Sequence, residues 1–300
     1  MPSSIPASDE ADAAPAPFGR RRAWLRPAGF PVVPVVILLV VFVIPAFFAD
    51  YLAPHDPYRL NLHARLQPPV FSGGTWEFVL GTDRMGRDIL SRILHGAWYV
   101  MAVSATGIMV GVVVGTVLGL VAGYARGWFD VLVMRLVDIS LALPAMLLAL
   151  ALAVAFGASF HAVILVVGFA LWAYFARQVR AEVLSLRESD FVARSRVAGS
   201  SHFRILYRHI LPNVVNTVVV LATLQVGIAI TLEASLSFLG IGIPRPTPTW
   251  GILVADGRDF IATYWWISFF PGLAILLTVL SVNLFGDWLR DRLDPKLRQV

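Results

Sequence analysis

The sequence predicts an all-α integral membrane protein with six transmembrane helices, and three observations carry this prediction. Of the 300 residues, 58% are hydrophobic and only 14% are charged, whereas soluble domains carry about 25% charged residues. The apolar residues form long blocks without charge, each long enough for the roughly 20 residues that cross a bilayer. Basic residues gather in the segments between particular blocks.

The six predicted spans follow from these blocks taken in order. The block 139–176 is too long for one crossing, because a helix of that length would reach about 57 Å, and the break around Gly157 divides it. Glycine recurs at every fourth residue from Gly107 to Gly123, which lets two helix backbones pack closely. Pro144 is expected to kink the third span. The predicted spans are 30–52, 98–123, 130–156, 160–181, 213–239 and 264–288.

The distribution of basic residues predicts that both termini are cytoplasmic. With this orientation most of the 24 basic residues lie in or beside cytoplasmic segments, as the positive-inside rule requires. The outer loop keeps several arginines, and its acidic residues, such as Asp83 and Asp88, are available to pair with them. The predicted organisation is a cytoplasmic tail over 1–29, a first span over 30–52, an extracytoplasmic loop over 53–97, a five-helix core over 98–290 containing a cytoplasmic loop over 186–212, and a cytoplasmic tail over 291–300.

The loop between the fourth and fifth spans is unusual. It contains VARSRVAGSSHFRILYRHILPN at 192–213, with four arginines and no acidic residue. We expect a short helix over 190–198 that Gly199 ends in the left-handed conformation, then a second short helix over 201–210 that runs into the fifth span. A loop whose arginines only fix orientation is the simpler alternative. Orientation needs neither a helix nor a glycine stop, so we favour a docking surface.

Signatures of catalysis are missing from the chain. There is no G-x-S-x-G, H-E-x-x-H or G-x-x-x-x-G-K-[ST] motif. The six His residues do not cluster at metal-ligand spacing, His202 and His209 are expected to be solvated or capping groups, and there is no cysteine. An intramembrane hydrolase would need a nucleophile and a base on facing helices, and no such pair is apparent. We therefore predict no catalytic residue, no metal site and no nucleotide site, and we attribute the net charge of +5 to cytoplasmic arginines rather than to nucleic-acid binding.

Polar residues within the predicted spans are candidates for a transport pathway, because they are costly in lipid. Gln225 lies within the fifth span, Glu233 near its outer end, and Asn283 late in the sixth. Interhelical hydrogen bonds are the alternative role for Gln225 and Asn283, and Glu233 is equally suited to meet a cationic amine or to hold a helix end. Arg135 and Asp138, at i and i+3, are expected to pair with each other.

An ordered series of motifs resembles the permeases of bacterial ABC importers. The loop at 186–212 is similar to their cytoplasmic "EAA" loop: Gly199 and Leu211-Pro212 keep its spacing, with Ala193-Arg194-Ser195 in place of the acidic-Ala-Ala triplet. The series resembles in particular the second (C-type) membrane subunit of the dipeptide, oligopeptide and nickel branch. Its motifs are LGTDRMGRDILSR at 80–92, ALP at 142–144, EASLSFLGIG at 233–242, PTPTWG at 246–251, DGRD at 256–259, FPGLAILL at 270–277 and NLFGDWLRDRLDP at 283–295.

The resemblance implies a multi-pass subunit of the bacterial cytoplasmic (inner) membrane that forms half of a translocation pathway. It implies as partners a homologous second permease, two cytoplasmic ATP-binding subunits that hold ATP and Mg, and an extracytoplasmic substrate-binding protein. The expected substrates are di- or oligopeptides; nickel chelates, opines and glutathione-type molecules are alternatives. An ion-coupled secondary carrier is a further alternative, which the single large Arg-rich loop argues against. The implied ATPase-coupling residues are Phe191, Val192, Arg194, Arg196, Gly199, Ser200 and Ser201.

Overall fold

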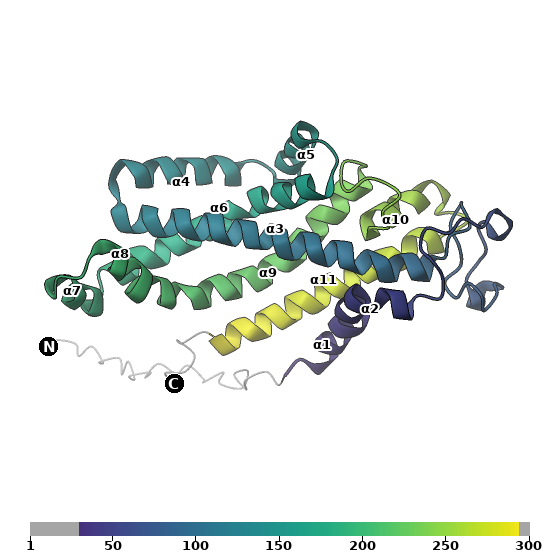
Figure 1. Cartoon of the computed structure of the whole chain (residues 1–300), viewed down its shortest axis with the longest axis horizontal. Helices are drawn as coiled ribbons and strands as arrows, with labels where there is room; N and C mark the ends of the chain where they lie inside the picture. The colour runs from purple at the N-terminus through teal and green to yellow at the C-terminus, as the bar shows by residue number, and fades with distance from the viewer. Residues whose placement is uncertain (1–29, 294–300) are drawn as a thin grey trace, which may run out of the picture.

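The computed structural model describes residues 30–293, and within them the chain forms an elongated bundle of helices (Figure 1). The predicted tail 1–29 and most of the predicted tail 291–300 lie outside the described residues. Five helices are long and apolar enough to cross a bilayer, and a bent pair adds a sixth if it counts as one span. The prediction of an all-helical membrane protein is therefore confirmed for the described part of the chain, with five or six candidate spans.

The helices follow one another in the predicted order, with some changed boundaries. A π-helical turn, Leu39–Val43, joins α1 to α2. The helices are α1 Val32–Leu38, α2 Ile44–Leu52, α3 Ile89–Ala125, α4 Gly127–Ala142, α5 Ala145–Phe156, α6 Phe160–Arg187, α7 Asp190–Val197, α8 His202–Arg204, α9 Leu211–Phe238, α10 Trp250–Gly257 and α11 Trp266–Leu293; short 3-10 turns lie at Leu62–Ala64, Val70–Ser72 and Arg258–Phe260.

The first boundary that differs is the start of α3. This helix begins at Ile89 rather than at residue 98, because the Asp88 side chain caps it by accepting a 2.9 Å hydrogen bond from the Ser91 amide. The segment between α2 and α3 therefore runs from residue 53 to Asp88; we call it the outer loop after its predicted position, and the predicted extracytoplasmic loop 53–97 stays a prediction. Arg92 lies in the first turns of α3 and is buried, so the helix starts with a polar, capped segment before its apolar part.

Pro144 and Pro212 differ in their effect on the helices. The kink expected at Pro144 is a bend of 100° between α4 and α5, so the predicted span 130–156 is two helices. Pro212 does not interrupt its helix: α8, the π-helical turn Ile205–Ile210 and α9 run on as one rod from His202 to Phe238. A proline has no backbone N–H and breaks the regular α-helical ladder, and here the π-helical turn precedes it.

The glycine stripe of α3 packs directly against α6. A Cβ on Gly111 would lie 3.2 Å from the carbonyl oxygen of Gly168 on α6, and one on Gly115 would overlap the carbonyl oxygen of Trp172. All five glycines from Gly107 to Gly123 are buried. This confirms that the stripe serves close backbone packing.

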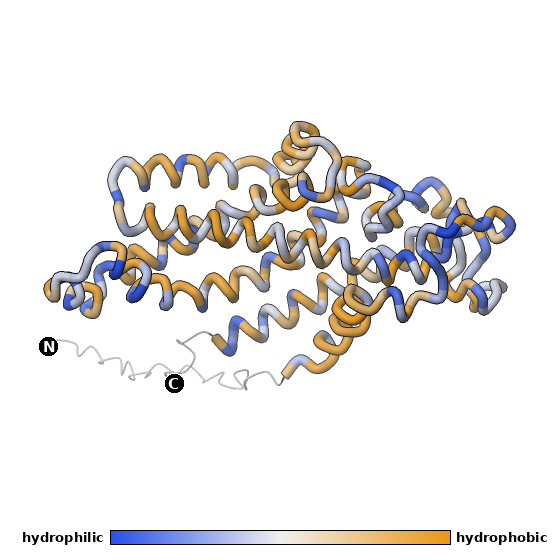
Figure 2. Tube along the Cα trace, viewed as in Figure 1, coloured by the Kyte–Doolittle hydropathy of each residue, from blue (hydrophilic) through white to orange (hydrophobic). Residues whose placement is uncertain are grey.

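The surface changes character along the bundle. Apolar residues dominate the long helices, while hydrophilic residues gather at the two ends (Figure 2). Exposed apolar side chains such as Val113, Val117 and Leu276 suit contact with lipid or with a second membrane subunit. The outer loop 53–88 and α10 lie at one end, and α7 and α8 at the other (Figure 1).

Candidate functional site

The segment after α6 forms the helix and stop that the sequence predicts. Gly199 has φ +77°, and its amide donates to the Arg196 carbonyl at 3.0 Å. The Ser200 amide donates to the Ser195 carbonyl at 3.1 Å. These two bonds form the Schellman arrangement that ends helices at a left-handed glycine. The predicted left-handed stop at Gly199 is confirmed.

One face of α7 is anchored and the other is open. Val192 is fully buried and belongs to the same apolar core as Val183 and Ile205. Val197, at the far end of the helix, is 90% exposed. The other residues assigned to coupling are exposed apart from Ser200, which is half-buried; they are Phe191, Arg194, Arg196, Gly199 and Ser201. The helix thus presents a mainly basic surface with Val197 at its tip, held from behind by Val192.

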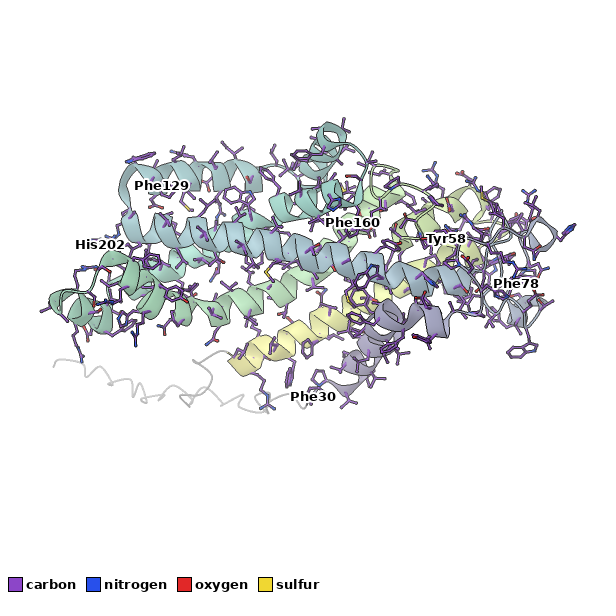
Figure 3. The ribbon with its side chains drawn as sticks, in the orientation of Figure 1. Phe30, Tyr58, Phe78, Phe129, Phe160 and His202 are labelled. Atoms are coloured by element: carbon purple, nitrogen blue, oxygen red, sulfur yellow. The ribbon has the colours of Figure 1, made fainter. Side chains whose placement is uncertain are left out.

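Both ends of this segment are bonded to the corner between α3 and α4. Before α7, the Arg126 guanidinium lies 2.7 Å from the Glu188 carboxylate. After α7, the Tyr124 hydroxyl lies 2.7 Å from Nδ1 of His202. The guanidinium of Arg187, the last residue of α6, lies over the same Tyr124 ring. His202 is exposed, as expected of a solvated group, and its ring also contacts α3 through Tyr124. It lies at the end of the bundle opposite Phe78 (Figure 3). These contacts connect the segment around α7 to the end of α3.

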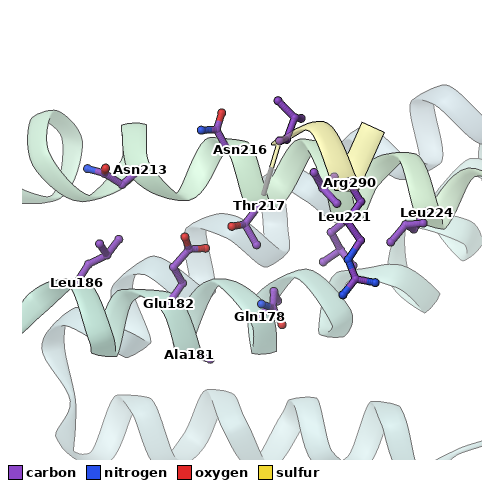
Figure 4. A pocket seen from close by; sticks show the side chains of 12 residues that line it. Gln178, Ala181, Glu182, Leu186, Asn213, Asn216, Thr217, Leu221, Leu224 and Arg290 are labelled. Carbon is purple, nitrogen blue, oxygen red and sulfur yellow. The ribbon is translucent and has the colours of Figure 1, made fainter. Parts of the chain in front are cut away.

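A cavity of about 930 Å³ lies next to this segment, between α6, α9 and α11. Glu182 projects into it from α6 and Arg290 from α11 (Figure 4). The Glu182 Oε2 atom is buried and accepts no hydrogen bond in the described part of the chain. The full lining is Gln178, Ala181, Glu182, Leu186, Asn213, Asn216, Thr217, Val220, Leu221, Leu224, Arg290 and Leu293.

The three predicted pathway residues lie outside this lining. Gln225 is buried in α9, and its Nε2 has no hydrogen-bond partner among the described residues. Glu233 is fully buried and accepts a 2.7 Å hydrogen bond from the Ser237 hydroxyl. Asn283 is exposed beside Gly227, where an added Cβ would lie 2.7 Å from its Oδ1. The structure does not bring these three together in one cavity, and their pathway role remains a prediction.

A buried ion cluster joins the outer loop to α10. Asp83 accepts 2.7 Å hydrogen bonds from Arg87 and Arg92, and all three side chains are buried. Asp256 of α10 lies 3.6 Å from both arginines and accepts a 2.9 Å bond from Arg245. The expected pairing of acidic residues with the loop arginines is confirmed for Asp83. The cluster fixes the outer end of α3 to α10.

A second set of ion pairs fastens α4 to α6. Arg180 binds Asp130 through two hydrogen bonds of 2.6 and 2.7 Å. Arg177 binds Asp138 at 2.6 Å. The predicted pairing of Asp138 with Arg135 is therefore wrong, because Asp138 faces α6, where the arginine of the neighbouring helix reaches it. Within residues 30–293 there is also no group of three or more His, Asp or Glu side chains that could hold a metal.

Residues 115–299 match a protein family described as the binding-protein-dependent transport system inner membrane component. The chain belongs to this family. It is therefore a multi-pass permease subunit of the inner membrane in a binding-protein-dependent ABC importer, in which partner subunits hydrolyse ATP. The resemblance found in the motifs is confirmed.

Similar proteins and a similar fold extend this result. The permease is 46% identical over 266 residues to the dipeptide transport system permease protein DppC of Escherichia coli strain K12, covering 88% of each chain. It is 39% identical over 265 residues to the di/tripeptide transport system permease protein DppC of Pseudomonas aeruginosa, covering 88% of this chain and 87% of the relative. The fold is similar to a chain of the MetNI methionine ABC transporter in an inward-facing conformation, with a TM-score of 0.56, 16% identity, and coverage of 69% of this chain and 98% of that one.

Proposed function

We propose that this permease imports short peptides as half of a translocation pathway whose other half is a homologous second permease. Two cytoplasmic subunits would bind ATP and Mg and supply the energy, and an extracytoplasmic binding protein would deliver the peptide. The relatives named for dipeptide and di/tripeptide transport, matched over 88% of this chain, support this substrate class. No cofactor is assigned to this chain itself.

The proposed topology has six spans with both termini in the cytoplasm, and α4 with α5 counts as one bent span. The coupling segment, residues 191–201 with α7, and the outer loop lie at opposite ends of the bundle (Figure 1). Because the coupling segment and the loop around it carry an excess of arginine, the positive-inside rule favours a cytoplasmic position for that end. The outer loop and α10 then face the binding protein.

The observation that carries the proposal is the anchored helix α7. Val192 and the contacts at Glu188 and His202 hold this helix against the bundle, while Val197 stays exposed for a partner. In the proposed cycle, ATP binding closes the two ATPases, α7 follows them, and α3 moves with α7. The bundle then changes between two states that the ATPases bias.

Reconstitution tests this proposal. Liposomes are prepared with both permeases, the ATPases and the binding protein, and uptake of a radiolabelled dipeptide is measured with and without ATP. We expect uptake only with all components and ATP. Uptake by the two permeases alone, driven by an ion gradient, would refute the importer mechanism, whereas uptake of only a nickel chelate, an opine or glutathione would replace the peptide substrate by one of those molecules.

A further inference from the structure

The cavity between α6, α9 and α11 has a polar lining where a lipid-facing surface would be apolar. Gln178, Asn213 and Asn216 are exposed side chains on helices that qualify as membrane spans. Polar side chains in spans face water or protein rather than lipid, because lipid offers them no hydrogen-bond partner. This face of the bundle is therefore directed toward the interior of the assembled transporter.

The charges in the cavity are few and opposite. Among the described residues, Glu182 is the only acidic lining residue of the cavity and Arg290 the only basic one. Among residues 30–293 no ion pair joins Glu182 to Arg290 or either of them to another side chain, and the Glu182 carboxylate is hydrogen-bonded to Thr217. Both side chains project into the cavity from different helices (Figure 4). Two separated charges of opposite sign suit a ligand that carries both charges itself.

We propose that this cavity binds the transported molecule, a short zwitterionic peptide, on its way to the cytoplasm. Glu182 receives the free α-ammonium group and Arg290 the free α-carboxylate. The side-chain amides of Gln178, Asn213 and Asn216 hydrogen-bond to the peptide groups between them, and the apolar part of the lining, such as Leu221 and Leu224, accepts side chains of varied size.

The geometry fits this occupant in volume and in chemistry. The volume of about 930 Å³ lies within the range of about 300–1,000 Å³ that is typical of ligand pockets. A guanidinium is well suited to a carboxylate, since it can form two parallel hydrogen bonds. Recognition of the two termini, with no demand on side chains, is what a carrier of many different peptides requires. This inference rests on the proposed import of peptides and adds the residues that recognise them.

Cysteine labelling tests access to the cavity, because the chain has no cysteine of its own. Asn216→Cys places a thiol in the lining, and Val215→Cys places one on the adjacent exposed residue of α9 outside it. The complete transporter in inside-out vesicles is treated with a charged, membrane-impermeant methanethiosulfonate. We expect rapid modification of Asn216→Cys, slowed by millimolar dialanine, and slow modification of Val215→Cys that dialanine does not change.

The charges are tested in the same Asn216→Cys background. Glu182→Gln or Arg290→Gln is expected to raise the dialanine concentration for half-protection by about tenfold or more, the loss typical of one hydrogen bond to a charged group. N-acetyl-dialanine amide, which has neither charge, is expected to protect at least about tenfold more weakly than dialanine. Asp287→Asn is the matched control: it removes an exposed charge from the same end of α11, outside the lining, and should leave protection unchanged.

Each outcome decides the inference. An Asn216→Cys thiol that does not react, equal protection by the uncharged peptide, or unchanged protection in Glu182→Gln and Arg290→Gln would overturn it. Uptake of radiolabelled dialanine by the wild-type transporter separates the two proposals. If the wild type imports dialanine and the variants show no charge effect, the site is wrong; if the wild type does not import it, the proposed function fails.

Discussion

Replacing Gly199 by valine should uncouple ATP hydrolysis from uptake without preventing membrane insertion. Gly199 has φ +77° and ends α7. No atom lies within 4 Å of a Cβ built there, so valine meets no steric obstacle from the rest of the chain. The cost comes from the backbone alone, because a β-branched residue strongly disfavours the left-handed conformation.

The size of the effect follows from this geometry. An L-residue in the left-handed region costs about 1–2 kcal/mol. This corresponds to a factor of about 5–30 between the observed end of α7 and other turns. Because Val192 still anchors the helix to the core, the permease folds and inserts. The orientation of the exposed tip at Val197 becomes variable, and the number of peptides imported per ATP should fall by a similar factor.

Proteoliposomes containing the complete transporter provide the assay. Uptake of labelled dipeptide and release of phosphate are measured in the same sample for Gly199→Val, Gly199→Ala and Gly199→Asn. Asparagine tolerates the left-handed conformation better than other residues with a side chain, so Gly199→Asn should retain most of the uptake per ATP. Equal ratios in Gly199→Val and Gly199→Asn would refute the backbone argument, and normal uptake in Gly199→Val would remove the coupling role.

Three further predictions concern other parts of the bundle. Gly115→Ala should lower the thermal midpoint of the solubilised transporter, because its Cβ would overlap the backbone of α6 and overpacking costs about 1–3 kcal/mol. Gly272→Ala, whose Cβ meets no atom within 4 Å, should not lower the midpoint. Equal losses in the two variants would contradict the packing argument. Asp256→Asn should destabilise by about 3–5 kcal/mol, because it leaves the Asp83 carboxylate alone to balance the two buried arginines Arg87 and Arg92. Asp259→Asn, in an exposed pair, should cost less than about 1 kcal/mol; similar unfolding of both variants by heat would count against the cluster. Tyr124→Phe should lower uptake per ATP, since it removes the hydrogen bond between α3 and the coupling segment, and an unchanged ratio in proteoliposomes would show that this bond transmits nothing.

Features with a local cause were predictable from the sequence. The four-residue spacing from Gly107 to Gly123 fixes which side of α3 is free of side chains, whatever the partner helix. Gly199 ends its helix because glycine alone enters the left-handed region without cost. Pro144 bends its span for a reason contained in the proline itself. The size of that bend depends on packing, and it was not predicted.

Features that depend on contacts between residues far apart in the chain could not be predicted from the sequence. Asp138 pairs with Arg177 rather than with Arg135, its neighbour in the chain, because α4 and α6 meet at this point. The predicted fourth span ends at residue 181, one residue before Glu182, whereas α6 continues to Arg187. A signal was present: Gln178 and Glu182 are four residues apart and therefore share one helix face. When a helix continues beyond the end of a predicted span, polar residues on one of its faces indicate a water-filled cavity.

The length of α3 has a consequence for communication between the two sides of the membrane. Its 37 residues form a rod about 55 Å long, with Arg92 in the outer ion cluster at one end and Tyr124 at the coupling segment at the other. The glycine stripe lets the backbone of this rod approach α6 closely, so we expect the two helices to tilt together. If the binding protein on the outside and ATP on the inside favour the same tilt, both act on the same equilibrium between the two states of the bundle. By thermodynamic linkage each must then strengthen the other's binding by the same factor.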